Sequence, residues 1–111
     1  MQSLDPIFDA LADSTRRAIL ARLALGETSV GELSEPFAVS APAISRHLKV
    51  LEGAGLISNT RVGKHRLCRL NRPRLAQASA WIAELTAATE ASFDRLEAYL
   101  KTLQDPNGSP E

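Results

Sequence analysis

The stretch from Ser40 to Arg74 concentrates the side chains that could bind a polyanion. It holds eight of the thirteen Lys and Arg residues of a chain whose formal net charge is zero, and its one carboxylate is Glu52. Eight positive charges against one negative charge give this stretch +7 and leave −7 on the rest of the chain. Positive charge concentrated in this way is typical of proteins that bind nucleic acid. The eight cations are Arg46, Lys49, Arg61, Lys64, Arg66, Arg69, Arg72 and Arg74.

Other site chemistries have little support in the sequence. No Gly-rich phosphate loop, paired-carboxylate site or Cys/His dyad at motif spacing is present. The side chains that could bind a borderline or soft metal, His47, His65 and Cys68, are dispersed, whereas such a metal needs ligands at site spacing. We therefore expect no catalytic site, no metal site and no cofactor.

Size and composition indicate one ordinary globular domain. The chain has 111 residues, of which 44% are hydrophobic, enough to bury about two-thirds of the unfolded surface. No run of eighteen apolar residues predicts a membrane span, the first residues lack the pattern of an export signal, and one cysteine fits the cytoplasm. We predict a single domain over residues 1–104 and a disordered tail over residues 105–111.

Helices must position most of the cations. Asp5 before Pro6, Asp13, Ser29 and Ser40 are the expected N-caps of four successive helices. The fourth helix should run to about Ala54 and be closed by a glycine. Two short β-like runs follow it, and the expected hairpin turn places glycine at its first central position. The elements of this hairpin are Leu56–Val62, Gly63-Lys64 and His65–Leu70.

The fourth helix has the pattern of a groove-reading helix. Ile44, Leu48 and Leu51 follow helical spacing and should be buried, which turns the cationic face outward. His47 lies beside the buried stripe, so packing, phosphate contact, operator contact and a pH switch all remain open for it. The expected DNA contacts from the helix and the hairpin are Ser40, Pro42, Ser45, Arg46, His47, Lys49, Arg61, Lys64, His65 and Arg66.

The last helix should extend from about residue 73 to 104. At 1.5 Å per residue, about thirty residues span roughly 45 Å, whereas a domain of this size is about 34 Å across. Part of its apolar stripe should therefore be covered by a second copy of the chain. Thr86 and Thr89 leave a break in the helix open, and Trp81 and Tyr99 could alternatively line an effector pocket. The expected dimerisation residues are Phe8, Leu75, Trp81, Ile82, Leu85, Phe93, Leu96 and Leu100.

The string SVGELSEPFAVSAPAISRHLKVLEGAGLI (Ser29–Ile57) resembles the ArsR-type bacterial transcriptional repressors. ALADSTRRAILARL (Ala10–Leu23) and the basic hairpin match this family as well, so that the resemblance covers about residues 5–75. It implies a mainly α winged helix-turn-helix fold with a small β-hairpin. It also implies a homodimeric repressor of palindromic operators, which commonly controls its own operon. The fourth helix would be the recognition helix, and the terminal helices would form the dimer interface.

The sequence departs from this family at its metal ligands. Metal-sensing members carry an E-L-C-V-C-D string on the third helix, where this chain has Ser29 and Gly31 in place of the cysteines. Other members bind zinc through Asp and His on the last helix, which contains no His here. The resemblance therefore implies a branch without the usual metal site, and any small-molecule effector stays unknown. Two alternatives remain open: a winged-helix module that binds an acidic protein, and a DNA-binding thiol sensor that uses Cys68.

Overall fold

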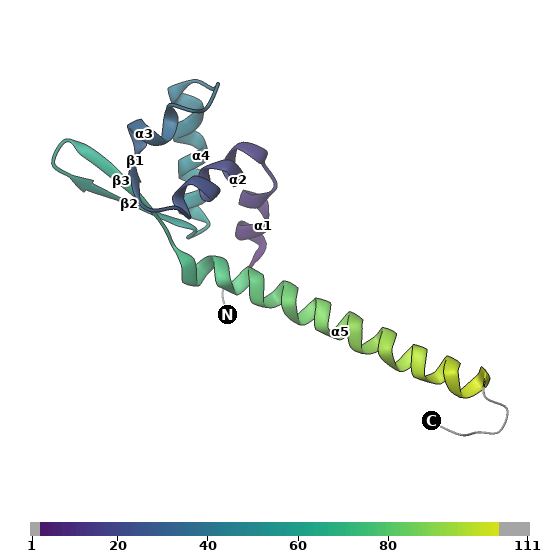
Figure 1. The fold of residues 1–111 in the computed structure, drawn as a ribbon. Coiled ribbons are helices and arrows are strands. Elements are labelled where there is room, and N and C mark those ends of the chain that lie inside the picture. Colours follow the sequence, from purple (N-terminus) through teal and green to yellow (C-terminus); the bar gives the residue numbers. More distant parts are fainter. Residues whose placement is uncertain (1–2, 105–111) are drawn as a thin grey trace. The chain divides into compact units, whose positions relative to one another are not determined.

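The computed structural model describes residues 3–104 and divides the chain into two units, Met1–Ala78 and Ser79–Glu111. The first unit contains four helices, a small sheet and the start of the last helix, and the second contains the rest of that helix (Figure 1). The tail expected to be disordered, residues 105–111, lies outside the described residues. In chain order the elements are α1 (Asp5–Leu11), α2 (Ser14–Leu23), β1 (Thr28–Ser29), α3 (Val30–Ser34), α4 (Ala41–Gly53), β2 (Ile57–Val62), β3 (His65–Leu70) and α5 (Arg72–Gln104).

Three of the four expected N-caps are confirmed. The side chains of Asp13, Ser29 and Ser40 each accept a hydrogen bond from a backbone N–H in the first turn of α2, α3 and α4. Such bonds satisfy backbone donors that have no partner within the helix. The expectation for Asp5 is wrong, because the N-cap of α1 is Leu4, whose side chain makes no capping bond. The helix begins one residue earlier than expected because proline is tolerated anywhere in a first turn.

The sheet has the strand order β1–β3–β2, with both pairings antiparallel. Strands β2 and β3 pair from Ile57↔Leu70 to Val62↔His65. Gly63 has a φ of +62°, which confirms glycine at the first central position of the turn. Strand β1 pairs with β3 and turns the expected hairpin into a three-stranded sheet. The hairpin tip extends beyond helices α1–α4 (Figure 1).

The core of the first unit confirms the buried stripe of α4. Ile44, Leu48 and Leu51 are 1%, 4% and 0% exposed. Burying these three side chains fixes the rotation of α4 and leaves its opposite face to solvent. The other buried hydrophobic residues come from the remaining helices, from the connection between α4 and β2, and from β2 and β3; they are Ile7, Ala10, Ile19, Leu20, Leu23, Leu33, Ala54, Leu56, Ile57, Cys68, Leu70 and Ala78.

The second unit is one uninterrupted helix over its described residues, 79–104. Thr86 and Thr89 do not break it, and their hydroxyls donate to the carbonyls of Ile82 and Leu85 one turn earlier. Among residues 3–104, no helix has the length and apolar character needed to cross a membrane. Large hydrophobic side chains that are between 47% and 65% exposed are Trp81, Ile82, Leu85, Phe93, Leu96, Tyr99, Leu100 and Leu103.

Candidate nucleic-acid interface

The outward face of α4 is polar, cationic and exposed. Pro42, Ser45, Arg46 and Lys49 all lie on it. Within residues 3–104, the side chains of Arg46 and Lys49 make no hydrogen bond or ion pair. At the start of the helix, the hydroxyl oxygen of Ser40 accepts a bond from the N–H of Ala43 at 3.3 Å. The fold therefore holds this helix by its apolar stripe and leaves its charged side chains available to a ligand.

The tip of the β2–β3 hairpin, residues 61–66, is a second exposed cationic surface. Arg61 lies directly opposite Arg66 in the antiparallel register, so the two side chains share one face of the hairpin. Like charges in this position destabilise a strand pair, and a bound anion would offset that repulsion. Lys64 lies in the turn, and His65 lies opposite Val62 on the other face.

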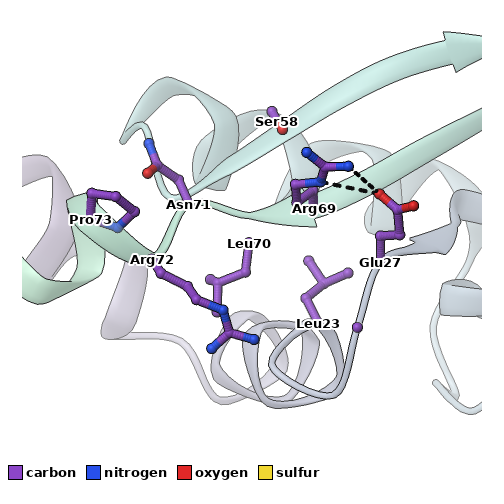
Figure 2. A pocket seen from close by; sticks show the side chains of 9 residues that line it. Leu23, Glu27, Ser58, Arg69, Leu70, Asn71, Arg72 and Pro73 are labelled. Carbon is purple, nitrogen blue, oxygen red and sulfur yellow. Dashed lines mark hydrogen bonds and ion pairs between the residues drawn. The ribbon is translucent and has the colours of Figure 1, made fainter.

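The remaining three cations of the basic stretch are bonded to distant parts of the first unit, whereas Arg61 makes only a local bond from Nε to the carbonyl of Gly63 in the hairpin turn, at 3.3 Å. Arg69 donates from Nε and Nη2 to a single carboxylate oxygen of Glu27, at 3.1 and 2.8 Å. Arg72 donates from Nη2 to the carbonyl of Ala24 at 2.9 Å, and Arg74 bonds to three different residues. Figure 2 shows Arg69 and Arg72 at a pocket of about 640 Å³, with Leu23 lying beside the Arg69–Glu27 pair. The basic stretch is thus partly structural: the sequence left Arg69, Arg72 and Arg74 out of the expected DNA contacts, but it did not predict these internal partners.

His47 belongs to a polar cluster between α4 and the beginning of α2. Its Nδ1 lies 3.4 Å from Nη1 of Arg16 and 3.8 Å from Oδ2 of Asp13. Arg16 also donates to the carbonyls of Ala10 and Asp9, so that it closes the C-terminal end of α1. The hydrogen bond from the backbone N–H of Arg16 has the largest effect on the pKa of Asp13 and lowers it. Burial opposes this effect, and the charges of His47 and Arg16 lower the pKa by smaller amounts. His47 is half-buried, which leaves part of its ring exposed beside the outward face.

Cys68 lies in β3, where its side chain is fully buried. Burial raises the pKa of its thiol, the charge of Glu52 raises it further, and Arg66 lowers it. A redox-sensing cysteine needs the reverse, an accessible thiol with a depressed pKa. The structure therefore does not support the alternative of a thiol sensor. In the described part of the chain, no three His, Cys, Asp or Glu side chains come together where they could hold a metal ion.

The residues expected at a dimer interface fall into two groups. Phe8 and Leu75, in the first unit, are partly buried against its core. Trp81, Ile82, Leu85, Phe93, Leu96 and Leu100, in the second unit, are all about half exposed or more, between 47% and 65%. The second group forms an apolar stripe that residues 79–104 do not cover themselves.

Comparison with known proteins places the sequence among bacterial regulators. The family model described as "Bacterial regulatory protein, arsR family" matches residues 13–59. The HTH-type transcriptional regulator Rv2034 of Mycobacterium tuberculosis is 48% identical over 75 residues, which are 68% of this chain and 70% of that protein. The transcriptional repressor SdpR of Bacillus subtilis is 37% identical over 79 residues, which are 71% of this chain and 88% of that protein.

Solved structures agree with this placement. The crystal structure of an ArsR family transcriptional regulator, RHA00566, is 38% identical, with a TM-score of 0.75 over 80% of this chain and 98% of that chain. The solution structure of a homodimeric winged helix-turn-helix DNA-binding domain, Mb0332 of Mycobacterium bovis, is 25% identical. Its TM-score is 0.61 over 75% of this chain and 77% of that chain. The mainly helical fold with a small antiparallel sheet is therefore the winged helix-turn-helix fold.

Proposed function

Because this chain belongs to the ArsR family of bacterial regulatory proteins, we propose that it is a cytoplasmic repressor that binds a palindromic operator as a homodimer. One observation carries the proposal: within residues 3–104, the cations of the basic stretch that make no bond to a distant part of the chain lie on α4 and at the hairpin tip, where Arg61 bonds only to the carbonyl of Gly63 in the turn. Arg46 and Lys49 have no partner within residues 3–104, whereas Arg69 and Arg74 are bonded within the chain. Unused cations on a helix and a hairpin next to it suit a DNA duplex.

Helix α4 is the reading element in this proposal. Its outward face enters the major groove, where Arg46 or Lys49 reaches the acceptors of guanine. Ser45 contacts a base edge or a phosphate, and Pro42 and His47 lie at the margins of the contact. Ser40, the N-cap of α4, lies at the helix N-terminus, where the backbone N–H groups and the positive end of the helix dipole attract a DNA phosphate.

The hairpin holds the DNA backbone. Arg61 and Arg66 share one face of the hairpin, and a phosphate between them relieves their mutual repulsion. Lys64 and His65 contact the neighbouring phosphates or the minor groove. These contacts fix orientation and carry no base information themselves.

The homodimer is proposed from the exposed apolar stripe of α5, supported by the homodimeric relative described above. Trp81, Leu96 and Leu100 would become buried against a second copy. Phe8 and Leu75, in the first unit, are also proposed dimerisation residues. A two-fold dimer places its recognition helices in successive major grooves about 34 Å apart, which is why the operator should be palindromic.

Selection of bound duplexes from a random library by the purified protein, followed by titrations at several salt concentrations, tests this function. With about 6–10 phosphate contacts, affinity should fall by roughly 10³–10⁵ between 50 and 200 mM salt. Arg46→Ala should relax base preference at one position, at a cost of about 1–3 kcal/mol. Lys64→Ala should weaken all sequences alike and reduce the salt slope by about 1. Lys101→Ala removes a lysine outside the basic stretch and should change neither quantity.

Three results would contradict the proposal. Absence of any salt-sensitive affinity for DNA would exclude DNA as the partner. Equal effects of Arg46→Ala and Lys64→Ala on every sequence would show that α4 is not the reading element. Poor discrimination between selected and random duplexes would favour the alternative of a module that binds an acidic protein.

A further inference from the structure

The C-terminal end of the recognition helix α4 is closed by a Schellman motif. The N–H of Leu56 donates to the carbonyl of Leu51 at 3.0 Å, and the N–H of Gly55 donates to that of Glu52 at 2.9 Å. Gly55 has a φ of +77°, which this motif requires and which glycine adopts without strain. The motif leaves the next carbonyls along the chain in need of partners.

Asn71 and Arg74, on either side of the first turn of α5, supply those partners. Nε of Arg74 donates to the carbonyl of Ala54 at 3.0 Å. The side-chain amide of Asn71 donates to the carbonyl of Gly55 at 2.8 Å, and its backbone N–H donates to that of Leu56 at 2.8 Å. Three consecutive carbonyls after the end of α4, those of Ala54, Gly55 and Leu56, are thus bonded to two residues that come later in the chain.

The two residues also hold each other. Oδ1 of Asn71 accepts a bond from the backbone N–H of Arg74 at 3.3 Å, so Asn71 caps α5 while it holds α4. A Cβ atom at position 55 would lie 3.4 Å from Nε of Arg74, which shows how closely this side chain packs on the end of α4. Loss of either residue should therefore disturb the bonds of the other.

All three guanidinium nitrogens of Arg74 are engaged. Nη1 donates to Oε1 of Gln77 at 2.7 Å, and Nη2 donates to the carbonyl of Ser3 at 3.1 Å, in addition to the bond from Nε. The planar fork reaches three separate acceptors, which a lysine ammonium on its flexible stem does not reproduce. Although Arg74 belongs to the basic stretch, its geometry is that of a clamp within the first unit.

We propose that Asn71 and Arg74 are positioning residues for operator recognition. They hold the C-terminal end of α4 in the orientation in which Arg46 and Lys49 meet the base edges, and Arg74 does not itself bind phosphate. The inference rests on the proposed function. Base readout depends on this support because a recognition group must be held within about 0.5 Å of its productive position.

The test compares charge-conserving variants by their specificity ratio, the affinity for the duplex selected by the wild-type protein divided by that for a scrambled duplex. Arg74→Lys and Asn71→Ala should each lower this ratio about tenfold, through weaker binding of the selected duplex, with an unchanged salt slope. The double variant should show about the same loss as either single variant, because the two residues act as one unit. Arg72→Lys, which alters an arginine bonded to α2 instead, is the matched control and should leave the ratio unchanged.

The alternatives give different results. If Arg74→Lys behaves as wild type while Arg74→Gln reduces the salt slope by about 1, Arg74 is a phosphate contact and the inference is wrong. If the two residues only stabilise the fold, the variants should contain a smaller fraction of DNA-binding-competent protein but keep the specificity ratio of the wild type. Stoichiometric titration with DNA measures that fraction, and this result also overturns the inference. If the wild-type protein selects a duplex and the variants keep its specificity ratio, the inference is wrong but the proposed function stands. Failure of the wild-type protein to select any duplex overturns the proposed function as well.

Discussion

Residues 3–78 and residues 79–104 use the same apolar pattern with opposite results. In the first unit, Ile44 and Leu51 follow helical spacing on α4 and are 1% and 0% exposed. In the second unit, Leu96 and Leu100 follow the same spacing on α5 and are 52% and 47% exposed. An apolar stripe therefore identifies a face that must be buried, and it does not identify the chain against which that face is buried.

The charged side chains of the two units also differ in the partners to which they bond. In the first unit, Arg16 bonds to His47, 31 positions later, and Arg69 bonds to Glu27, 42 positions earlier, so that both tie separate segments together. In the second unit, Lys101 lies 3.7 Å from Glu97 one turn earlier, with both side chains more than two-thirds exposed. An exposed pair of this kind contributes little to stability. The described part of the second unit thus has an exposed apolar stripe and local charge pairs, whereas the first unit is supported by its own core and bonds.

Leu51→Ala should have the largest effect and would sharpen this comparison on the side of the first unit. Because Leu51 is fully buried, its truncation should lower the free energy of unfolding by about 2–5 kcal/mol. Urea titration followed by circular dichroism measures the loss. Ser45→Ala on the exposed face of the same helix is the control, with an expected change of at most about 0.5 kcal/mol. Similar losses in both variants would contradict the assignment of the two faces of α4.

Leu100→Ala should have a smaller effect, which depends on protein concentration. If the stripe of α5 is a dimer interface, truncating Leu100 should weaken self-association by about 1–3 kcal/mol. Sedimentation equilibrium over a range of concentrations measures this change, and Asp94→Ala on the polar side of the helix is the control. If the wild-type protein stays monomeric at high concentration, the stripe of α5 is not a dimer interface, because no second copy covers it.

Local sequence signals were sufficient for most of the fold. The caps at Asp13 and Ser40, the buried stripe of α4 and the Gly63 turn each depend on residues within a few positions of one another. The exception among the helix starts is Asp5, because two adjacent positions can begin a helix before the same proline. Strand β1 was not predicted, since two residues show no periodicity and their pairing with β3 is set by the tertiary fold.

The internal partners of Arg69, Arg72 and Arg74, which were not among the expected DNA contacts, could not be predicted, because they are distant in the sequence. Arg69 bonds to Glu27 across 42 positions, and Arg74 bonds to Ser3 across 71 positions. Neither spacing has a local signature, so the sequence does not show that these arginines bind groups of the fold. The net charge of the stretch predicts a polyanionic ligand, and the structure adds which of its cations are bonded to distant parts of the fold.

Asp13→Asn should have the smallest effect, and it tests whether the charged cluster between α2 and α4 stabilises the first unit. The pKa of Asp13 lies below its usual value of 3.8, chiefly because the carboxylate accepts a bond from the N–H of Arg16. A group with a depressed folded-state pKa contributes stability above its unfolded pKa and loses it as the pH falls through the folded value. The wild-type protein should therefore be more stable than the variant at pH 6, and this advantage should disappear as the pH falls below 3.8.

Thermal unfolding of both proteins from pH 6 to pH 2 measures this convergence, with Glu90→Gln as the matched loss of one carboxylate from the second unit. Asparagine retains an oxygen that can cap α2, so the difference isolates the negative charge of Asp13 beside Arg16 and His47. The exposure of the carboxylate keeps the difference small. A difference that is constant across this range would mean that Asp13 acts through its cap alone, and the charged cluster between α2 and α4 would then contribute nothing to the stability of the first unit.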